Sequence, residues 1–364
     1  MSRSARSCRA ARHVALLLLL LPLIPPVIAQ VIPRASAETL GDAIAAAYET
    51  NPQLAAARAR QEALAETPEQ ERALARPTLS VEGNGGYDRQ GYGKAASLTA
   101  NLALPIWTGG RVSSALRAAN GDVAAGEQGL RDSEAAILQG VVSAYAALLY
   151  NQQAVEVARV GIQRLDMQVS ETRARYDLGQ ATRTDVAQLE AQRATVVANL
   201  ADAEGALATA EATYRAAVGH DAGTLVADVP TPAALPASRD EARRAAEDAN
   251  PALLQQRLAV DASAARVDRA RAEGAPSVDL GGSLGRGERW ADGRLDDFEN
   301  AASVGITLRV PLLTGGLVAS RVRQAEANTR AERFLADAAE RDAMRGADTA
   351  WAALTAAGAR LRAN

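Results

Sequence analysis

The chain of 364 residues has few of the groups on which enzymes and metal proteins depend: one cysteine, two histidines and only 3% aromatic residues. The cysteine is Cys8, so no disulfide can form within the chain. His220 stands alone beside a proline-rich segment, and no Cys/His cluster suggests a metal site. After the N-terminal region no run of 18 apolar residues occurs, so any membrane crossing would have to use β-strands. We therefore predict no metal, no cofactor and no enzymatic activity.

The N-terminal region has the pattern of a secretory signal peptide. Four arginines precede an apolar run from Val14 to Leu21, and Ala35-Ser36-Ala37 is a small-x-small cleavage site, with Ala29 as an alternative. The apolar run is far shorter than the roughly 20 residues of a membrane-spanning helix. Removing residues 1–37 removes five arginines and leaves 35 basic against 43 acidic residues. The resulting charge of −8 argues against nucleic-acid binding.

The rest of the chain is internally duplicated. Two early landmarks recur 199 residues later and two later ones recur after 206 residues, in the same order. The matched landmarks are Asn51-Pro52 with Asn250-Pro251, Pro77 with Pro276, Pro105-Ile106-Trp107-Thr108-Gly109-Gly110 with Pro311-Leu312-Leu313-Thr314-Gly315-Gly316, and Ala144-Tyr145-Ala146-Ala147-Leu148 with Ala350-Trp351-Ala352-Ala353-Leu354. The offset changes from 199 to 206 residues between Pro276 and Pro311, where a loop is expected. We predict repeats at 38–218 and 240–364, joined by a proline-rich linker at 219–239.

Each repeat predicts a helix followed by two strands. Asn51 and Asn250 are good caps for helices that begin at the following prolines, and Pro68 should kink or split the first helix. Apolar and polar residues then alternate in segments long enough to cross a bilayer at a tilt. The predicted strands are about 78–88, 97–106, 277–285 and 302–312. A soluble, half-buried sheet would show the same alternation. Four strands cannot close a channel-wide barrel, so a membrane barrel would need several chains.

A very long helix is predicted after each Thr-Gly-Gly. The first covers about 111–176, a rod of roughly 100 Å, and a turn at 177–182 leads into a returning helix at 183–218. Gly179 can adopt the left-handed conformation of such a turn. The second long helix begins at about 317, and its tip would fall near residue 382. We therefore expect the second tip and the last returning helix to be absent from this sequence.

These features resemble the TolC family of outer-membrane channel proteins. The resemblance rests on the duplicated Thr-Gly-Gly turns, on the order of the elements, and on the tip Tyr176-Asp177-Leu178-Gly179-Gln180-Ala181-Thr182. It implies a mainly α fold with a small membrane β-sheet, in a homotrimer whose twelve strands form one barrel above a helical periplasmic cylinder. It also implies a passive exit duct in outer-membrane lipid, for drug efflux or type I secretion. Such ducts dock to a periplasmic adaptor, a membrane fusion protein driven by an inner-membrane transporter.

The resemblance also assigns roles to residues of this chain. Leu178, Gly179 and Gln180 match the tip that meets the adaptor, although Gln180 replaces a commonly apolar residue. Arg183, Thr184 and Asp185 match contacts that close the periplasmic mouth, and this stretch looks most like type I secretion members. Asp185 could instead be a solvated acid that supports the start of the returning helix. The matched barrel-to-helix transitions are Pro105, Thr108, Gly109, Gly110, Pro311, Thr314, Gly315 and Gly316.

Two alternatives remain beside the channel subunit. One is a non-functional truncated fragment of such a channel, in which the incomplete second repeat leaves gaps in the wall and exposes Leu354 and Leu361. The other is a periplasmic coiled-coil adaptor, which also has a long helical hairpin. Adaptors carry lipoyl-like and barrel domains beside that hairpin, rather than a strand pair before each long helix.

Overall fold

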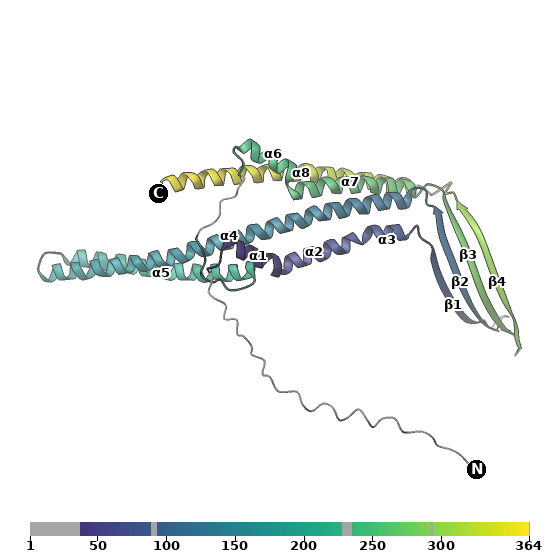
Figure 1. Cartoon of the computed structure of the whole chain (residues 1–364), viewed down its shortest axis with the longest axis horizontal. Helices are drawn as coiled ribbons and strands as arrows, with labels where there is room; N and C mark the ends of the chain where they lie inside the picture. The colour runs from purple at the N-terminus through teal and green to yellow at the C-terminus, as the bar shows by residue number, and fades with distance from the viewer. Residues whose placement is uncertain (1–36, 89–92, 228–234, 292–293, 364) are drawn as a thin grey trace, which may run out of the picture.

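The computed structural model describes residues 37–88, 93–227, 235–291 and 294–363. The predicted signal peptide, apart from Ala37, lies outside the described residues, and so does part of the predicted linker. Two helical stretches, two strands and a long helix follow one another in this order in both halves, and a returning helix follows in the first half (Figure 1). The first half contains α1 (Leu40–Thr50), α2 (Pro52–Ala65), α3 (Thr67–Ala73), β1 (Thr78–Asp88), β2 (Gly93–Trp107), α4 (Arg111–Asp177) and α5 (Arg183–Val218). The second half contains α6 (Arg239–Ala249), α7 (Pro251–Ala272), β3 (Ser277–Ala291), β4 (Arg294–Arg309) and α8 (Leu317–Ala363).

The helices before the sheet begin where the Asn-Pro pairs stand. The Asn51 side chain accepts hydrogen bonds from the backbone N–H groups of Gln53 (2.8 Å) and Leu54 (3.3 Å). Asn250 accepts one from Leu253 (3.0 Å), 199 residues after the first cap. Pro68 lies in the first turn of α3, so the predicted interruption splits one helix into α2 and α3.

The structure corrects the boundaries of three strands. β2 begins at Gly93 rather than 97, and β3 continues to Ala291 rather than 285. β4 covers Arg294–Arg309 instead of 302–312. Pairing between antiparallel strands uses backbone groups, so the ladder continues where the side-chain alternation has already ended. β4 stops short because Pro311 has no N–H to donate.

The four strands form one antiparallel sheet in the order β1-β2-β3-β4, which joins the two repeats through β2 and β3. Its register places Leu79, Leu102 and Val304 in one row across the sheet, and all three are exposed. The adjacent row contains Ser80, Asn101, Ser283 and Ser303. Since neighbouring residues point to opposite faces, one face of the sheet is apolar and open and the other is polar.

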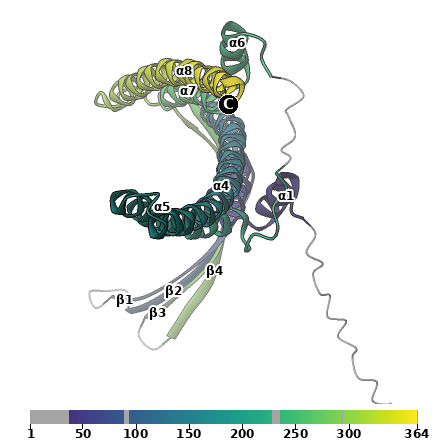
Figure 2. The same ribbon diagram turned by 90° about the vertical axis from the view of Figure 1, so that its left-hand side faces the viewer.

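The long helices form a curved layer. Seen along the long axis of the molecule, α5, α4, α7 and α8 lie on an arc (Figure 2). Among the described helices, only α4 has a stretch long and apolar enough for a membrane span by length and composition, with a mean hydropathy of 1.2. This is weak support for a span, because α4 packs against α1, α2, α3, α5 and α7.

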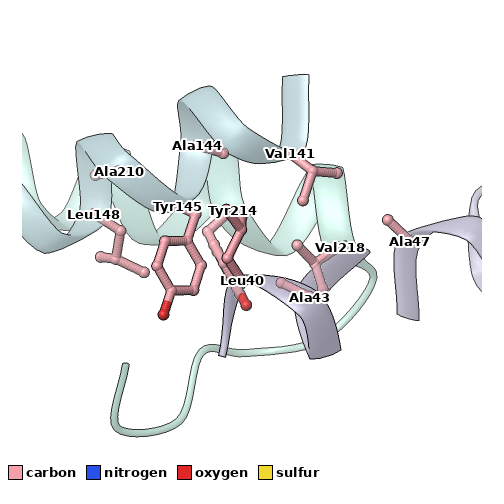
Figure 3. Packing of buried hydrophobic residues seen from close by; sticks show 10 residues of the cluster. All are labelled: Leu40, Ala43, Ala47, Val141, Ala144, Tyr145, Leu148, Ala210, Tyr214 and Val218. Carbon is pink, nitrogen blue, oxygen red and sulfur yellow. The ribbon is translucent and has the colours of Figure 1, made fainter. Parts of the chain in front are cut away.

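The main core lies midway along α4. Three helices contribute to it, and the two tyrosine rings lie side by side with their centroids 6.4 Å apart (Figure 3). The buried residues are Leu40, Ala43 and Ala47 of α1, Val141, Ala144, Tyr145 and Leu148 of α4, and Ala210, Tyr214 and Val218 of α5. This cluster fixes the point at which α5 ends against α4.

The structure adds two helices that the predicted elements did not include, α1 and α6. Thr39 caps α1 and exchanges hydrogen bonds with Asp42, and Ser238 caps α6 through the N–H of Glu241. The spacing of a capping residue three before an acid was visible in the sequence. The predicted linker therefore ends at Ser238, because Arg239 already belongs to α6.

Candidate functional site

The turn between α4 and α5 forms the end of the molecule farthest from the sheet (Figure 1). Gly179 has φ 73°, its N–H donates to Tyr176 O (2.9 Å), and the N–H of Gln180 donates to Arg175 O (2.8 Å). These two bonds form a Schellman motif, which needs a left-handed residue at Gly179. A Cβ added at Gly179 would meet nothing within 4 Å. The requirement for glycine is therefore conformational rather than steric.

The returning helix α5 begins with a capping box. The Thr182 hydroxyl accepts from Asp185 N (3.2 Å), and the Asp185 carboxylate accepts from Thr182 N (2.8 Å). The backbone and side-chain hydrogen bonds of Thr182 lower the pKa of Asp185 below its ordinary 3.8. The carboxylate thus supports the start of the helix, which corresponds to the second of the two roles considered for it.

The remaining predicted tip residues are exposed around this capped turn. Leu178 is 74% exposed and directs an apolar side chain to solvent beside Gln180. Arg183 and Thr184 occupy the first turn of α5 and are also exposed. The structure therefore brings the predicted docking residues and the predicted mouth residues together on one surface, the hairpin tip.

Ion pairs between α4 and α5 stiffen the hairpin behind the tip. Arg173 pairs with Glu190 and Arg193 pairs with Asp166. Both pairs are exposed, so each contributes little stability by itself. Their spacing along the hairpin holds the two helices in one register.

The two sheet-to-helix turns have the same geometry. Gly109 and Gly110 have φ 62° and 85°, and Gly315 and Gly316 have φ 58° and 81°. In the first turn Arg111 N donates to Thr108 O, and in the second Leu317 N donates to Thr314 O, both at 3.1 Å. Pro105 lies within β2, beside a register shift, whereas Pro311 follows the end of β4. The duplicated sequence therefore folds into a duplicated backbone.

A family model for outer membrane efflux proteins matches residues 43–220 and 242–364. The chain belongs to the outer membrane efflux protein family. It is 30% identical to the outer membrane efflux protein BepC of Brucella suis, over 91% of this chain and 73% of that protein. It is 27% identical to the outer membrane protein TolC of Vibrio cholerae, over 80% of this chain and 68% of that protein. These matches confirm the predicted family.

Solved structures show the same fold. Crystal structures of CusC align with a TM-score of 0.75 over 89% of this chain and 77% of that chain, at 17% identity. As an outer membrane efflux protein, the chain is a transport protein of the outer membrane with a helical periplasmic extension, and not an enzyme. Its described residues contain no group of three or more His, Cys, Asp or Glu able to hold a metal ion.

This outer membrane efflux protein also has a polar cluster that sequence reasoning missed. The Glu38 carboxylate accepts from Tyr214 Oη (2.6 Å) and Gly223 N (3.2 Å), and His220 Nε2 lies 3.4 Å from it. Tyr145 Oη donates to Glu38 O (2.9 Å). Burial and the bond to Glu38 raise the pKa of Tyr214. Glu38 thus fastens the start of the described chain to the end of α5 through Tyr214, and His220, which stands alone in the sequence beside the proline-rich segment, lies against it.

The capping box predicts a pH dependence confined to the tip. A carboxylate whose pKa is lowered by folding stabilises the folded state above its ordinary pKa, here 3.8, and this contribution disappears as the pH falls through the folded value. We expect amide protection at the start of α5 to weaken below pH 3.8 in the natural chain and to be less dependent on pH in Asp185→Asn. Thr182→Ala should weaken the same turn by about 1 kcal/mol. Hydrogen exchange, corrected for intrinsic rates, measures both.

The Thr39–Asp42 box at α1 is an internal control, since it has the same pair of hydrogen bonds and lies far from the tip. Neither substitution should change the protection of the backbone amides at the start of α1 from hydrogen exchange. Equal pH dependence at α5 in the natural chain and in Asp185→Asn would contradict the assigned role of the carboxylate.

Proposed function

We propose that this chain is the subunit of a passive exit duct, in which three copies form one twelve-stranded barrel in the outer membrane and a periplasmic helical cylinder. The observation that carries the proposal is that the two ends of the molecule differ. An open apolar sheet face lies at one end, and an exposed, capped helical tip lies at the other. The 67-residue α4 separates them by about 100 Å. A lipid-facing sheet and a distant docking tip are what a duct across the periplasm needs.

The open edges of the sheet support a closed assembly. Within the described chain β1 pairs only with β2, and β4 pairs only with β3, so each leaves a row of backbone groups unpaired. Unpaired backbone groups cannot face lipid, because no water is there to satisfy them. Three copies would pair each β4 with a neighbouring β1 and so close the sheet.

The tip supplies the docking surface in this proposal. Leu178, Gly179 and Gln180 would contact a periplasmic adaptor, through which an inner-membrane transporter drives export. Arg183, Thr184 and Asp185 would lie at the periplasmic mouth. The efflux protein BepC matches most of the chain, which favours an efflux pump, while type I secretion is the second candidate on the resemblance of the tip.

The assembly predicts a trimer that conducts. Protein extracted from the outer membrane should have the mass of three copies by native mass spectrometry, and it should form ion-conducting channels in planar bilayers. Heat-denatured protein is the control for background conductance. A monomer under conditions that keep the fold, or a trimer without conductance, would rule the duct out.

The tip predicts a docking defect in Gly179→Pro. Proline holds φ near −65° and removes the N–H that donates to Tyr176, so the Schellman turn cannot form. We expect binding of the adaptor's helical hairpin to weaken at least about tenfold, roughly 1.4 kcal/mol. Immobilised trimer and a titration of adaptor measure this.

Gly205→Ala is the matched control for Gly179→Pro. Gly205 lies within α5, away from the tip, and a Cβ there would meet nothing within 4 Å. It should bind the adaptor like the natural chain. Normal adaptor binding by Gly179→Pro, with trimers intact, would show that the tip is not the docking surface.

A further inference from the structure

The α4–α5 hairpin is fastened firmly at one end. Within α5, which is described throughout, the buried residues are Ala210, Tyr214 and Val218, all in the last nine residues of the helix. The stretch from Arg183 to Thr209 contains no buried residue and packs against α4 alone. α1 reaches α5 only at the end where the core lies. The direction in which the hairpin points is therefore set where α5 ends.

The length of the hairpin turns a small rotation at that end into a large displacement at the tip. Ala210 lies 27 residues after Arg183, so about 40 Å of helix separate the core from the tip. A rotation of about 5° at the core would move the tip by roughly 3 to 4 Å. This exceeds the length of a hydrogen bond, so polar groups at the tip would no longer meet the groups of a partner.

Two buried tyrosines fasten α4 and α5 to the start of the described chain. The Tyr145 hydroxyl of α4 lies 2.9 Å from Glu38 O and 2.7 Å from Val226 O. The Tyr214 hydroxyl of α5 donates to the Glu38 carboxylate (2.6 Å). Glu38 also forms a parallel bridge with Leu225. Each tyrosine is 1% exposed or less, so a lost partner could not be replaced by water without opening the core.

The chain that follows α5 fastens the same end from the other side. Val218 O accepts from the Thr50 hydroxyl of α1 (3.1 Å). Gly219 then turns the chain with φ 99°, and a Cβ there would lie 2.7 Å from Thr50 Oγ1. Four residues later Gly223 N donates to the Glu38 carboxylate (3.2 Å). The end of α5 is thus bonded to the chain on both sides of α1.

The second repeat has a different arrangement at the equivalent place. The position of Glu38 is occupied by Ala237, and that of Tyr145 by Trp351, which has no hydroxyl. α6 is the equivalent of α1, but it has no buried residue, whereas α1 has three. A cavity of about 600 Å³ lies between α6 and α8. The bonds around Glu38 therefore belong to the α4–α5 hairpin and are not a general feature of the repeat.

We propose that Glu38, Tyr145 and Tyr214 are positioning residues for the hairpin tip. Their hydrogen bonds stop α5 from rotating about its C-terminal end, and removing them lets the tip move while the chain stays folded. The apolar side chains of the same core, such as Leu148 and Val218, keep the fold without these bonds. The inference goes beyond the proposed duct and does not depend on it, because the direction of the hairpin is a property of one chain.

Spin labels on α1 and on the tip measure this direction. In a Cys8→Ser background, Glu49→Cys and Gln180→Cys provide the only thiols, and both positions are exposed. The rise of α4 places the labels about 50 Å apart. Dilution with unlabelled protein restricts double electron–electron resonance to distances within one chain. We expect Tyr214→Phe and Glu38→Ala each to broaden the distance distribution at least about twofold, because each leaves a buried group without its partner.

Paired variants show whether the effect comes from the bond itself. Glu38→Ala combined with Tyr214→Phe should broaden the distribution no further than Glu38→Ala alone, since both changes remove the same bond. Glu38→Gln should broaden it less than Glu38→Ala, because the amide oxygen can still accept from Tyr214. Glu38→Gln also removes no buried volume, so it carries the test for any variant that does not fold.

Leu253→Ala is the matched control for lost stability. Leu253 is 0% exposed on α7, away from the hairpin, so its truncation should lower the urea midpoint at least as much as Tyr214→Phe does. Its distance distribution should remain that of the natural chain. Unchanged distributions in Tyr214→Phe and Glu38→Ala, or equal broadening in Leu253→Ala, would overturn the proposal. Neither result bears on trimer formation or conductance, which test the duct separately.

Discussion

Leu148→Ala is expected to lower the free energy of unfolding by about 3 kcal/mol, and Leu354→Ala by about 1 kcal/mol or less. The two leucines occupy the same position of the two repeats, 206 residues apart. Leu148 is 0% exposed in the core between α1, α4 and α5, so its truncation leaves a cavity. Leu354 is 47% exposed, so its truncation leaves a much smaller cavity.

Urea unfolding of monomeric protein in detergent, followed by helical circular dichroism, measures both costs. The same chemical change in two equivalent helices makes each variant the control for the other. Leu361 is 81% exposed, and Leu361→Ala should be nearly silent. Equal costs for Leu148→Ala and Leu354→Ala would mean that the core packs differently from the structure.

Gly109→Ala should destabilise the chain by about 3 kcal/mol, from roughly 1–2 kcal/mol for the left-handed backbone and the rest for steric overlap. Gly109 has φ 62°, and a Cβ there would lie 2.6 Å from the Cβ of Ala275 and 2.7 Å from Pro276 O. Neither atom is the end of a flexible side chain, so the β2–α4 turn and the start of β3 would have to move apart.

Gly315→Ala is the control that separates strain from overlap. Gly315 has φ 58°, but a Cβ there would meet nothing within 4 Å of the same chain. We expect only the backbone cost, about 1–2 kcal/mol, when unfolding is measured on monomeric protein. Similar losses for the two variants would show that the contact between Gly109 and the start of β3 is unimportant.

Local signals in the sequence predicted a large part of the fold. Asn-Pro pairs placed the starts of α2 and α7, and Thr-Gly-Gly placed the starts of α4 and α8 within one residue. The turn was expected at 177–182 with Gly179 in it, and the structure has Gly179 left-handed there and α5 beginning at Arg183. Caps and left-handed turns depend on residues within a few positions of each other, so the sequence expresses them directly.

The candidate site was predicted less completely. Asp185 was considered for two roles, and the structure shows its carboxylate bonded to Thr182, three residues away. The cluster around Glu38 was missed because its members are distant in sequence, with Tyr214 lying 176 residues from Glu38. A single acid, a tyrosine and a linker histidine carry no periodic signal that would join them.

The sequence by itself determined the duplication, the order of the elements, the left-handed turn at Gly179 and the family. Each of these depends on short motifs or on their repetition. The tertiary structure alone decided where the strands end, that β2 pairs with β3, and that equivalent residues such as Leu148 and Leu354 have different surroundings. Burial and strand pairing depend on neighbours that lie far apart in the chain. Two copies of one pattern can therefore fold alike and still be covered differently.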